Sequence, residues 1–265
     1  ADGSKLAITA RGDIYSIPVE EGITKNINNS SGSHERDGVF SPDNKFIAYI
    51  SDKSGEDEIY IYNISNNTEK QVSSNSNAYK FNLKWSPDSK KIIFNDKTFS
   101  LYYIDLETFK TTLIDASESN NILHYNWSPN SKWIVFSKDF KDSNQKICLY
   151  NLDSKQVTEI TEGWYFSSNP IFSSDGNFIF FTSNRNFSPI WSDVEWNHAY
   201  KDMAKIYFVT VKEEITSPFA PKSNKNEFKN EPYSIDLNDI SHRIEEIPVE
   251  PANYWNISVI DNKVY

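Results

Sequence analysis

One turn, written Ser-Pro-Asp or a close variant, recurs along the chain at nearly constant intervals. It heads the aligned segments ADGSKLAI (1–8), SPDNKFIAYI (41–50), SPDSKKIIFN (86–95), SPNSKWIVFS (128–137) and SSDGNFIFFT (173–182). The turn residue recurs after 41, 45, 42 and 45 positions, at Asp2, Asp43, Asp88, Asn130 and Asp175. A nearly fixed period of this length indicates a chain built from repeated supersecondary units.

Each repeat holds four short extended segments around the turn. The segment before the turn ends in a large apolar residue, namely Phe40, Trp85, Trp127 or Phe172. An apolar segment follows, then a third such as DEIYIYNI (57–64), and then a more polar fourth that suits an exposed edge strand. Four strands in a period of about 42 residues are typical of one β-propeller blade. We therefore expect an all-β propeller with four-stranded antiparallel blades.

The turn chemistry explains why the string is repeated. Pro presets the first central position of a type I turn, Asp or Asn accepts backbone N–H bonds, and Ser or Gly suits the exit. The turn is therefore predicted to fix the register between the first two strands of each blade, which is a structural role.

The repeat also predicts the organisation of the chain as one propeller domain over residues 1–265. The expected units are a partial blade 1–30, blades 31–75, 76–117, 118–162 and 163–250, and a partial blade 251–265. The long unit carries insertions 184–203 and 213–241, because Asp261, the next turn residue, lies 86 positions after Asp175. Aromatic residues in the first insertion are expected to pack on the propeller or cap one face: Trp191, Trp196 and Tyr200.

About five to six blades are thus expected, and the two incomplete ends leave two arrangements open. Residues 255–260 would close a ring of five by pairing with the opening blade. Alternatively, the ring continues beyond Tyr265 into a larger, seven-bladed one.

Composition excludes several classes of partner. The net charge of −10 and pI near 5.0 argue against nucleic acid, which binds clustered Lys and Arg. No apolar stretch approaches the roughly 20 residues that span a bilayer, so we expect no membrane partner. Cys148 is the only cysteine, which excludes an intrachain disulfide and favours the cytoplasm. The chain starts at Ala1 without a visible signal peptide, as expected for a piece of a longer protein. An export signal upstream would place it in the periplasm.

The repeat also supports a resemblance to known families. The Ser-Pro-Asp-x-Lys turn resembles the repeats of TolB-like proteins and of dipeptidyl-peptidase and tricorn peptidase propellers. Four longer stretches, in this order, resemble the second propeller of tricorn-type serine peptidases: ARGDIYSIPVEEG (10–22), GSHERDGVFSPD (32–43), WSPDSKKIIFNDKTFSLYYIDLET (85–108) and ITSPFAP (215–221). The resemblance runs the length of the chain.

This resemblance implies a role within a larger peptidase. In that family a six-bladed propeller precedes a seven-bladed one, followed by catalytic regions that flank a PDZ-like domain. The seven-bladed propeller is regarded as a route by which peptides reach an internal chamber. The chain resembles about five and a half of those seven blades and lacks the regions with the catalytic serine and histidine, so no catalytic residue carries over. The implied partners are oligopeptide substrates, other domains of the parent, and further copies in a homo-oligomer of the parent.

The residues themselves show no catalytic motif. There is no GxSxG, HExxH, P-loop or GxGxxG string, although a triad can assemble from distant positions. The acidic SDKSGEDE segment (51–58) would suit a hard cation, but a solvated hairpin tip is the favoured interpretation. The histidines lack zinc-site spacing. We expect no metal and no cofactor, and activity of the chain itself stays open.

The best candidates for a functional surface are polar residues at the approach to each first strand. Inner strands line the channel of a propeller, so His34, Glu35, Arg36 and Asp37, just before a first strand, are expected to face the channel. Equivalent positions in the other units are Tyr79, Lys80, His124, Tyr125, Ser168, Asn169, Asn253 and Tyr254. Such a ring would contact an extended peptide without reading its sequence. The alternative is that Glu35, Arg36 and Asp37 pair with neighbouring blades.

Arg185, after the second strand of the 163–250 unit, is a further substrate-channel candidate. The function that the sequence favours is non-catalytic: gating or channelling peptides to a serine-peptidase centre outside the chain. The alternative is a TolB-like scaffold for protein–protein interaction. A third interpretation, a small-molecule enzyme in the propeller funnel, lacks a convergent acid–base pair.

Overall fold

The computed structural model describes residues 3–28, 30–74, 77–186, 189–191, 198–220, 233–254, 256–260 and 262–265. The chain divides into two compact units, Ala1–Leu123 and His124–Tyr265. Two of the predicted turn residues, Asp2 and Asp261, lie outside the described residues, as do Trp196 and the side chains of Trp191 and Tyr200. The predicted packing of that aromatic insertion therefore stays a prediction.

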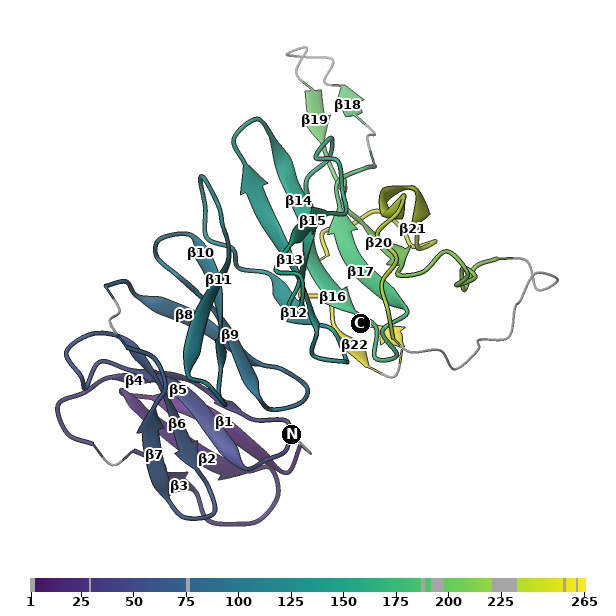
Figure 1. Ribbon diagram of the computed structural model, residues 1–265. Coiled ribbons are helices and arrows are strands. Elements are labelled where there is room, and N and C mark those ends of the chain that lie inside the picture. Colours follow the sequence, from purple (N-terminus) through teal and green to yellow (C-terminus); the bar gives the residue numbers. More distant parts are fainter. Residues whose placement is uncertain are drawn as a thin grey trace. The chain divides into compact units, whose positions relative to one another are not determined.

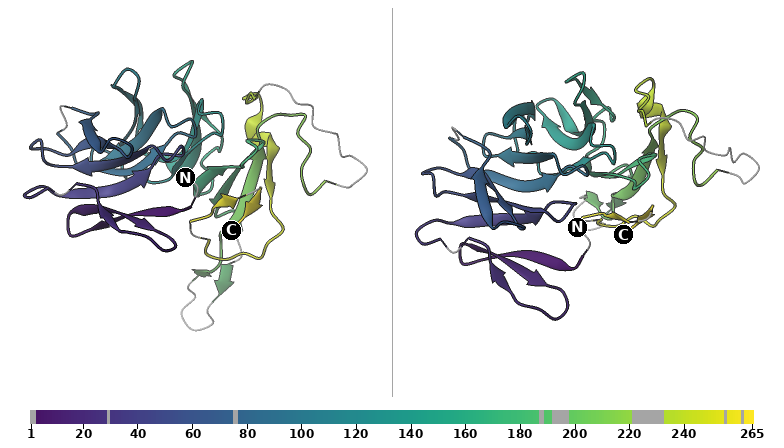
Figure 2. Two further views of the ribbon diagram at one scale, coloured as in Figure 1. Left: turned by 90° about the horizontal axis from the view of Figure 1, so that it is seen from below. Right: turned by 60° about the horizontal axis from the view of Figure 1, so that its bottom comes forward.

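The first unit consists of three antiparallel sheets that follow one another along the chain (Figures 1 and 2). The first is β1 (Lys5–Ala10), β2 (Asp13–Pro18) and β3 (Lys25–Asn26). The second is β4 (Glu35–Phe40), β5 (Phe46–Ser51), β6 (Glu58–Asn63) and β7 (Thr68–Gln71). The third is β8 (Lys80–Trp85), β9 (Lys91–Asp96), β10 (Ser100–Asp105) and β11 (Lys110–Ala116).

The second unit contains two further four-stranded sheets. One is β12 (Tyr125–Trp127), β13 (Trp133–Phe140), β14 (Ser143–Asn151) and β15 (Val157–Glu159). The other is β16 (Ser167–Phe172), β17 (Phe178–Ser183), β20 (Lys205–Thr210) and β21 (Ile244–Glu246), which a short 3₁₀ helix, Ile240–Arg243, precedes. The expectation of four-stranded antiparallel sheets is thus confirmed.

Two short hairpins complete the second unit. β18 (Pro189–Trp191) and β19 (His198–Tyr200) lie within the first predicted insertion and project away from the large sheet (Figure 1). β22 (Val259–Ile260) pairs with β23 (Lys263–Val264) near the end of the chain. The first insertion therefore lengthens the connection between β17 and β20, and these two strands still pair with each other.

The repeated turn has the same geometry in successive sheets. The amide of Asn44 donates to the carbonyl of Ser41 at 3.0 Å, and Asn44 itself has a φ of 59°. The Ser41 hydroxyl donates to Asp43 at 2.6 Å and accepts the amide of Phe46 at 3.0 Å. The exit position needs a left-handed backbone, which Asn, Ser or Gly tolerates best in turns. The equivalent exit residues are Ser89, Ser131 and Gly176.

Apolar side chains fill the space between neighbouring sheets. Ile50 and Ile59 of the second sheet pack with Leu83 and Phe94 of the third. In the second unit, Val135, Ile147 and Leu149 belong to one cluster with Phe181 and Val209. The other face of the second sheet packs on the first, where Ile14 lies in one cluster with Ile47 and Tyr49. Because this sheet is covered on both faces, its middle strands β5 and β6 are almost continuous apolar runs.

Hydrogen bonds one repeat apart also join neighbouring sheets. The indole N–H of Trp85 donates to the carbonyl of Val39 at 3.1 Å. The amide of Asp43 donates to the hydroxyl of Ser89, also at 3.1 Å. In the second unit the amide of Phe172 donates to the side-chain oxygen of Asn126 at 3.4 Å. The turn residue of one sheet thus also contacts the corresponding turn of the next.

Candidate functional site

The first strand of the second sheet begins earlier than the sequence analysis placed it. β4 starts at Glu35, so Glu35, Arg36 and Asp37 lie inside the strand and only His34 precedes it. The register of β4 against β5 shifts between Arg36 and Val39, and Asp37 within this bulge has a φ of 55°. A bulge redirects side chains without ending a strand, which explains how the charged residues fit into β4.

Glu35 is completely buried and serves as an acceptor for three serine hydroxyls. Ser30 donates at 2.9 Å, Ser33 at 2.6 Å and Ser51 at 2.9 Å. A buried carboxylate is tolerated only when it is hydrogen-bonded in this way. Glu35 therefore holds the preceding segment against the strands, while the neighbouring side chain of His34 stays exposed.

Arg36 joins the second sheet to the third. Its Nη2 donates to Asp57 in an ion pair, and its Nε donates to the hydroxyl of Tyr79 at 2.6 Å. The guanidinium lies 3.7 Å from the centre of the Tyr79 ring, within the range of a cation–π contact. Only 9% of Arg36 is exposed, and its Nη1 is buried with no hydrogen-bond partner among the described residues.

Lys80 begins β8 beside this ion pair. Its Nζ donates to the carbonyl of Asp57 at 2.8 Å and lies 3.6 Å from the carboxylate of Glu58. Burial lowers the pKa of the Lys80 ammonium, and the nearby carboxylates, Glu58 first, oppose that shift. Arg36, Asp57, Glu58, Tyr79 and Lys80 together form what we call the buried ionic cluster.

The acidic partners in this cluster come from the segment that the sequence favoured as a solvated hairpin tip. That interpretation is wrong for Asp57 and Glu58, since Glu58 is 3% exposed and both face basic side chains. Asp52 accepts the backbone amide of His34 at 2.8 Å. Their signal in the sequence was two acids at the start of the predicted strand 57–64. The basic partners lie elsewhere in the chain, so the pattern alone did not reveal the pairing.

Asp37 and Asn169 occupy matching positions in their sheets. The Asp37 carboxylate accepts the backbone amide of Asn82 in the next sheet at 3.1 Å. Asn82 and Asn169 share the positive φ of Asp37, at 55° and 53°, and each lies at a register shift of its inner strand. The Asn169 amide donates to Thr182 at 3.2 Å. These residues lie at bulges in the inner strands. The repeated turns in the sequence did not predict these bulges.

His124 and Tyr125 differ in exposure. Tyr125 starts β12 and is 1% exposed, so its ring belongs to the core of the second unit. His124 is half-buried, and its carbonyl accepts the amide of Ser137 at 2.9 Å. Of these two residues, His124 is therefore the one with a partly accessible side chain.

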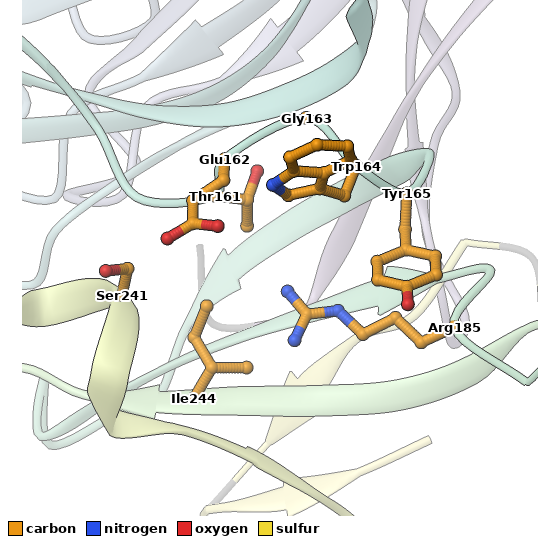
Figure 3. Close-up of a pocket in the computed structure, with 8 residues that line it drawn as sticks. All are labelled: Thr161, Glu162, Gly163, Trp164, Tyr165, Arg185, Ser241 and Ile244. Atoms are coloured by element: carbon orange, nitrogen blue, oxygen red, sulfur yellow. The ribbon is translucent and has the colours of Figure 1, made fainter.

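Arg185 follows β17 and lines a separate pocket in the second unit (Figure 3). The pocket has a volume of about 140 Å³ and is lined by residues 161–165, Arg185, Ser241 and Ile244. The guanidinium lies 5.0 Å from the ring centre of Tyr207 and 5.8 Å from that of Tyr165. Burial lowers the pKa of Arg185, although the tyrosines and Glu162 favour its charged form.

The structure therefore places the predicted residues in more than one environment. Arg36 and Lys80, from two adjacent sheets of the first unit, both contact Asp57, while Asp37 contacts Asn82 instead. Arg185 lies in its own pocket in the second unit. Among the described residues, no three His, Cys, Asp or Glu side chains are grouped to hold a metal ion. Within the same residues, no helix is long and apolar enough to cross a bilayer.

Comparison with known proteins places this architecture in a family. Residues 1–265 match the family described as the tricorn protease second beta propeller domain. The chain belongs to this family. It is 26% identical over 268 residues to a tricorn protease homolog of Saccharolobus solfataricus, and the match covers 100% of the chain and 24% of that protein.

Solved structures agree on the fold. The crystal structure of the tricorn protease aligns with this tricorn second propeller at a TM-score of 0.85, with 21% identity, over 97% of the chain and 25% of the matched one. A putative TolB from Agrobacterium tumefaciens aligns at a TM-score of 0.54, with 20% identity, over 79% of the chain and 74% of that protein. The chain thus spans about a quarter of the length of the tricorn relatives it matches.

Proposed function

We propose that this tricorn second propeller guides peptides to a serine-peptidase centre that lies elsewhere in a longer parent protein. The proposal depends mainly on the family match over residues 1–265. The chain covers only 24% of the tricorn protease homolog of Saccharolobus solfataricus, which supports a longer parent protein. The proposed role is non-catalytic, and the proposed partners are oligopeptides and the remaining domains of the parent.

The geometry of the inner strands supports a guiding surface. The buried ionic cluster fixes the first residues of β4 and β8, since Arg36 and Lys80 both contact Asp57. Breaking such a cluster by removing one partner leaves an uncompensated buried charge. Arg36 is therefore a positioning residue, and the exposed His34 directly before β4 is the group available to a passing peptide.

The test uses the parent enzyme with His34→Cys modified by a bulky polyethylene-glycol maleimide. A bulky group at the start of an inner strand should obstruct an extended oligopeptide more than a small aminoacyl chromogenic amide. We expect kcat/KM for the oligopeptide to fall by about tenfold, with a much smaller change for the small substrate.

Thr111→Cys in the outer strand β11 is the matched control, because Thr111 is also exposed but lies on the last strand of its sheet. Cys148 is fully buried and should not react in the folded chain. Equal oligopeptide hydrolysis by the two labelled variants would contradict guidance at His34 and favour a scaffold role instead.

A further inference from the structure

The pocket around Arg185 combines features that the guiding role does not use. We call it the Arg185 pocket and define it by residues 161–165, Arg185, Ser241 and Ile244. Its charged group is fixed in place, because the guanidinium lies 5.0 Å from the Tyr207 ring centre and its Nε donates to Ser183 at 3.3 Å. Among the described residues, Arg185 forms no ion pair, unlike Arg36, which pairs with Asp57.

Two exposed aromatic residues line this pocket, and a third exposed aromatic residue follows them in the chain. Trp164 is 79% exposed, Tyr165 45% and Phe166 43%. Large aromatic side chains clustered on a surface mark interaction sites, whereas scattered single ones do not. Figure 3 shows the Trp164 ring over one side of the pocket and the Arg185 guanidinium between Trp164 and Ile244.

The loop that carries these aromatics is held in shape. Asn144 donates through its side-chain amide to the carbonyls of Gly163 and Trp164, at 3.2 and 3.1 Å. Thr161 accepts the amide of Ile147 at 2.9 Å. Gly163 has a φ of 83°, a backbone conformation that glycine adopts readily and residues with a Cβ rarely adopt. A site formed before its ligand arrives loses less conformational entropy on binding.

We propose that the Arg185 pocket binds the α-carboxylate end of an amino acid or peptide, with the carboxylate on Arg185 and the terminal side chain against Trp164. A guanidinium presents paired donors that match a carboxylate. The volume of about 140 Å³ is well below the roughly 300–1,000 Å³ of drug-sized pockets and suits one terminal residue.

Glu162 supplies a second point of recognition. Its carboxylate and the Ser241 hydroxyl lie across the pocket from the guanidinium (Figure 3). With the carboxylate of the ligand on Arg185, these two acceptors would face the nitrogen of the ligand. That nitrogen is the ammonium of a free amino acid or the amide N–H of a terminal peptide residue. An anion without such a donor would gain only the contact with Arg185. The peptide form of this proposal rests on the proposed function, whereas the amino-acid form does not.

The experiment is photo-crosslinking of the parent protein, treated with a serine-peptidase inhibitor so that the probe is not cleaved. The probe is an alanine peptide that ends in photo-leucine with a free carboxylate, and its counterpart carries a C-terminal amide. We expect crosslinks within residues 161–166 or 241–244 from the free acid, and about tenfold fewer from the amide.

Arg185→Gln should reduce the crosslinks to a similar extent, while Arg11→Gln, at an exposed arginine in the first unit, should not. Arg185→Lys, which keeps the charge but not the paired donors, should give an intermediate yield of crosslinks. In each variant, a Cys148 thiol that does not react with a maleimide shows that the chain is folded. Competition by free leucine would identify an amino-acid ligand, and competition by the alanine peptide alone would identify a peptide end.

Equal labelling by acid and amide, an unchanged yield in Arg185→Gln, or crosslinks only outside the pocket would overturn the proposal. The result is independent of the test at His34, since one locates a bound carboxylate and the other measures the hydrolysis of peptides.

Discussion

Single carboxylates in the repeated turn are coupled to the stability of the fold. Asp88 accepts the hydroxyl of Ser86 at 2.5 Å and the amide of Lys90 at 3.0 Å, and lies 3.4 Å from the ammonium of Lys91. Burial raises the pKa of Asp88, but these hydrogen bonds and charges outweigh it, so the net pKa lies below its ordinary value of 3.8. Because its folded-state pKa is lowered, Asp88 stabilises the fold above pH 3.8, and this contribution is lost as the pH falls through the folded-state pKa.

Asp88→Asn should therefore make the chain less sensitive to acid. Asn130 occupies the same turn position in the next repeat and accepts the Ser128 hydroxyl at 2.6 Å, so an amide fits the geometry. We expect the free energy of unfolding in urea to change by only about 1 kcal/mol at pH 7, and to fall less steeply than in the wild type below pH 4.

The reverse substitution, Asn130→Asp, is the matched control and should add acid sensitivity to the fourth sheet. If the difference between Asp88→Asn and the wild type were the same at pH 7 and pH 3, the carboxylate would have no titrating role in the turn.

The residue scale also shows where sequence reasoning reached its limit. The turn residues were predictable because their partners lie within five positions, as Ser41, Asp43 and Phe46 do. The buried ionic cluster was not, because Arg36 reaches Asp57 and Tyr79, which are 21 and 43 positions away. From sequence alone, charged residues are predicted to be exposed to solvent, because most of them are. Their burial can be recognised only when the fold is known.

At the scale of elements, one aromatic position adds a hydrogen bond to the apolar contact between the second and third sheets. Trp85 ends β8, is 8% exposed and donates its indole N–H to Val39 in the adjacent sheet. The sequence identified the recurring large residue before each turn and the order of the strands. It did not reveal the bulges in β4, β8 and β16, because the positive φ values at their Asp and Asn residues depend on the sheet context.

Trp85→Phe should lower the free energy of unfolding by about 1–3 kcal/mol, because it leaves the Val39 carbonyl without its donor and removes part of a packed ring. Urea unfolding followed by circular dichroism measures this loss. Trp133→Phe is the control, since Trp133 packs at the edge of a core cluster and has no hydrogen bond between sheets among the described residues. A cost for Trp85→Phe no greater than that of the control would show that the indole bond adds nothing to the contact.

At the scale of the whole molecule, the chain was predictable to the level of repeated antiparallel sheets and family, both of which the comparisons confirm. The single-domain boundaries and the channel surface stay predictions. Local patterns fix most sheets, since their strands pair with the next strand in the chain, and only β20 pairs across long insertions among the described strands. A channel depends instead on how distant repeats are arranged. The Arg185 pocket illustrates this limit, because its lining residues 161–165, Ser241 and Ile244 are far apart in the sequence.

Cys148 offers a direct measure of whether the chain keeps a closed core. It is the only cysteine, lies in β14 and is 0% exposed. Labelling of the native chain with a maleimide should be slower than labelling of the urea-unfolded chain by a factor on the order of 10³ or more, because reaction requires opening of the core.

Ser154→Cys, at an exposed turn of the same sheet, should react at the rate of a free thiol in both states. Rapid labelling of native Cys148 would mean that the sheet opens readily and that its packing contributes little stability.

The hydrogen bonds one repeat apart have a consequence for how such chains arise. At the joint between the second and third sheets, Trp85 donates to the carbonyl of Val39 and Ser89 accepts the amide of Asp43. The amide of Asp175 donates in the same way to the side chain of Asn262 in the last hairpin. Such head-to-tail contacts are heterologous, because the two sheets at a joint contribute different groups. Duplication or loss of a complete repeat would leave each joint with a matching half, and chains of this kind are thereby free to change length in steps of one blade during evolution.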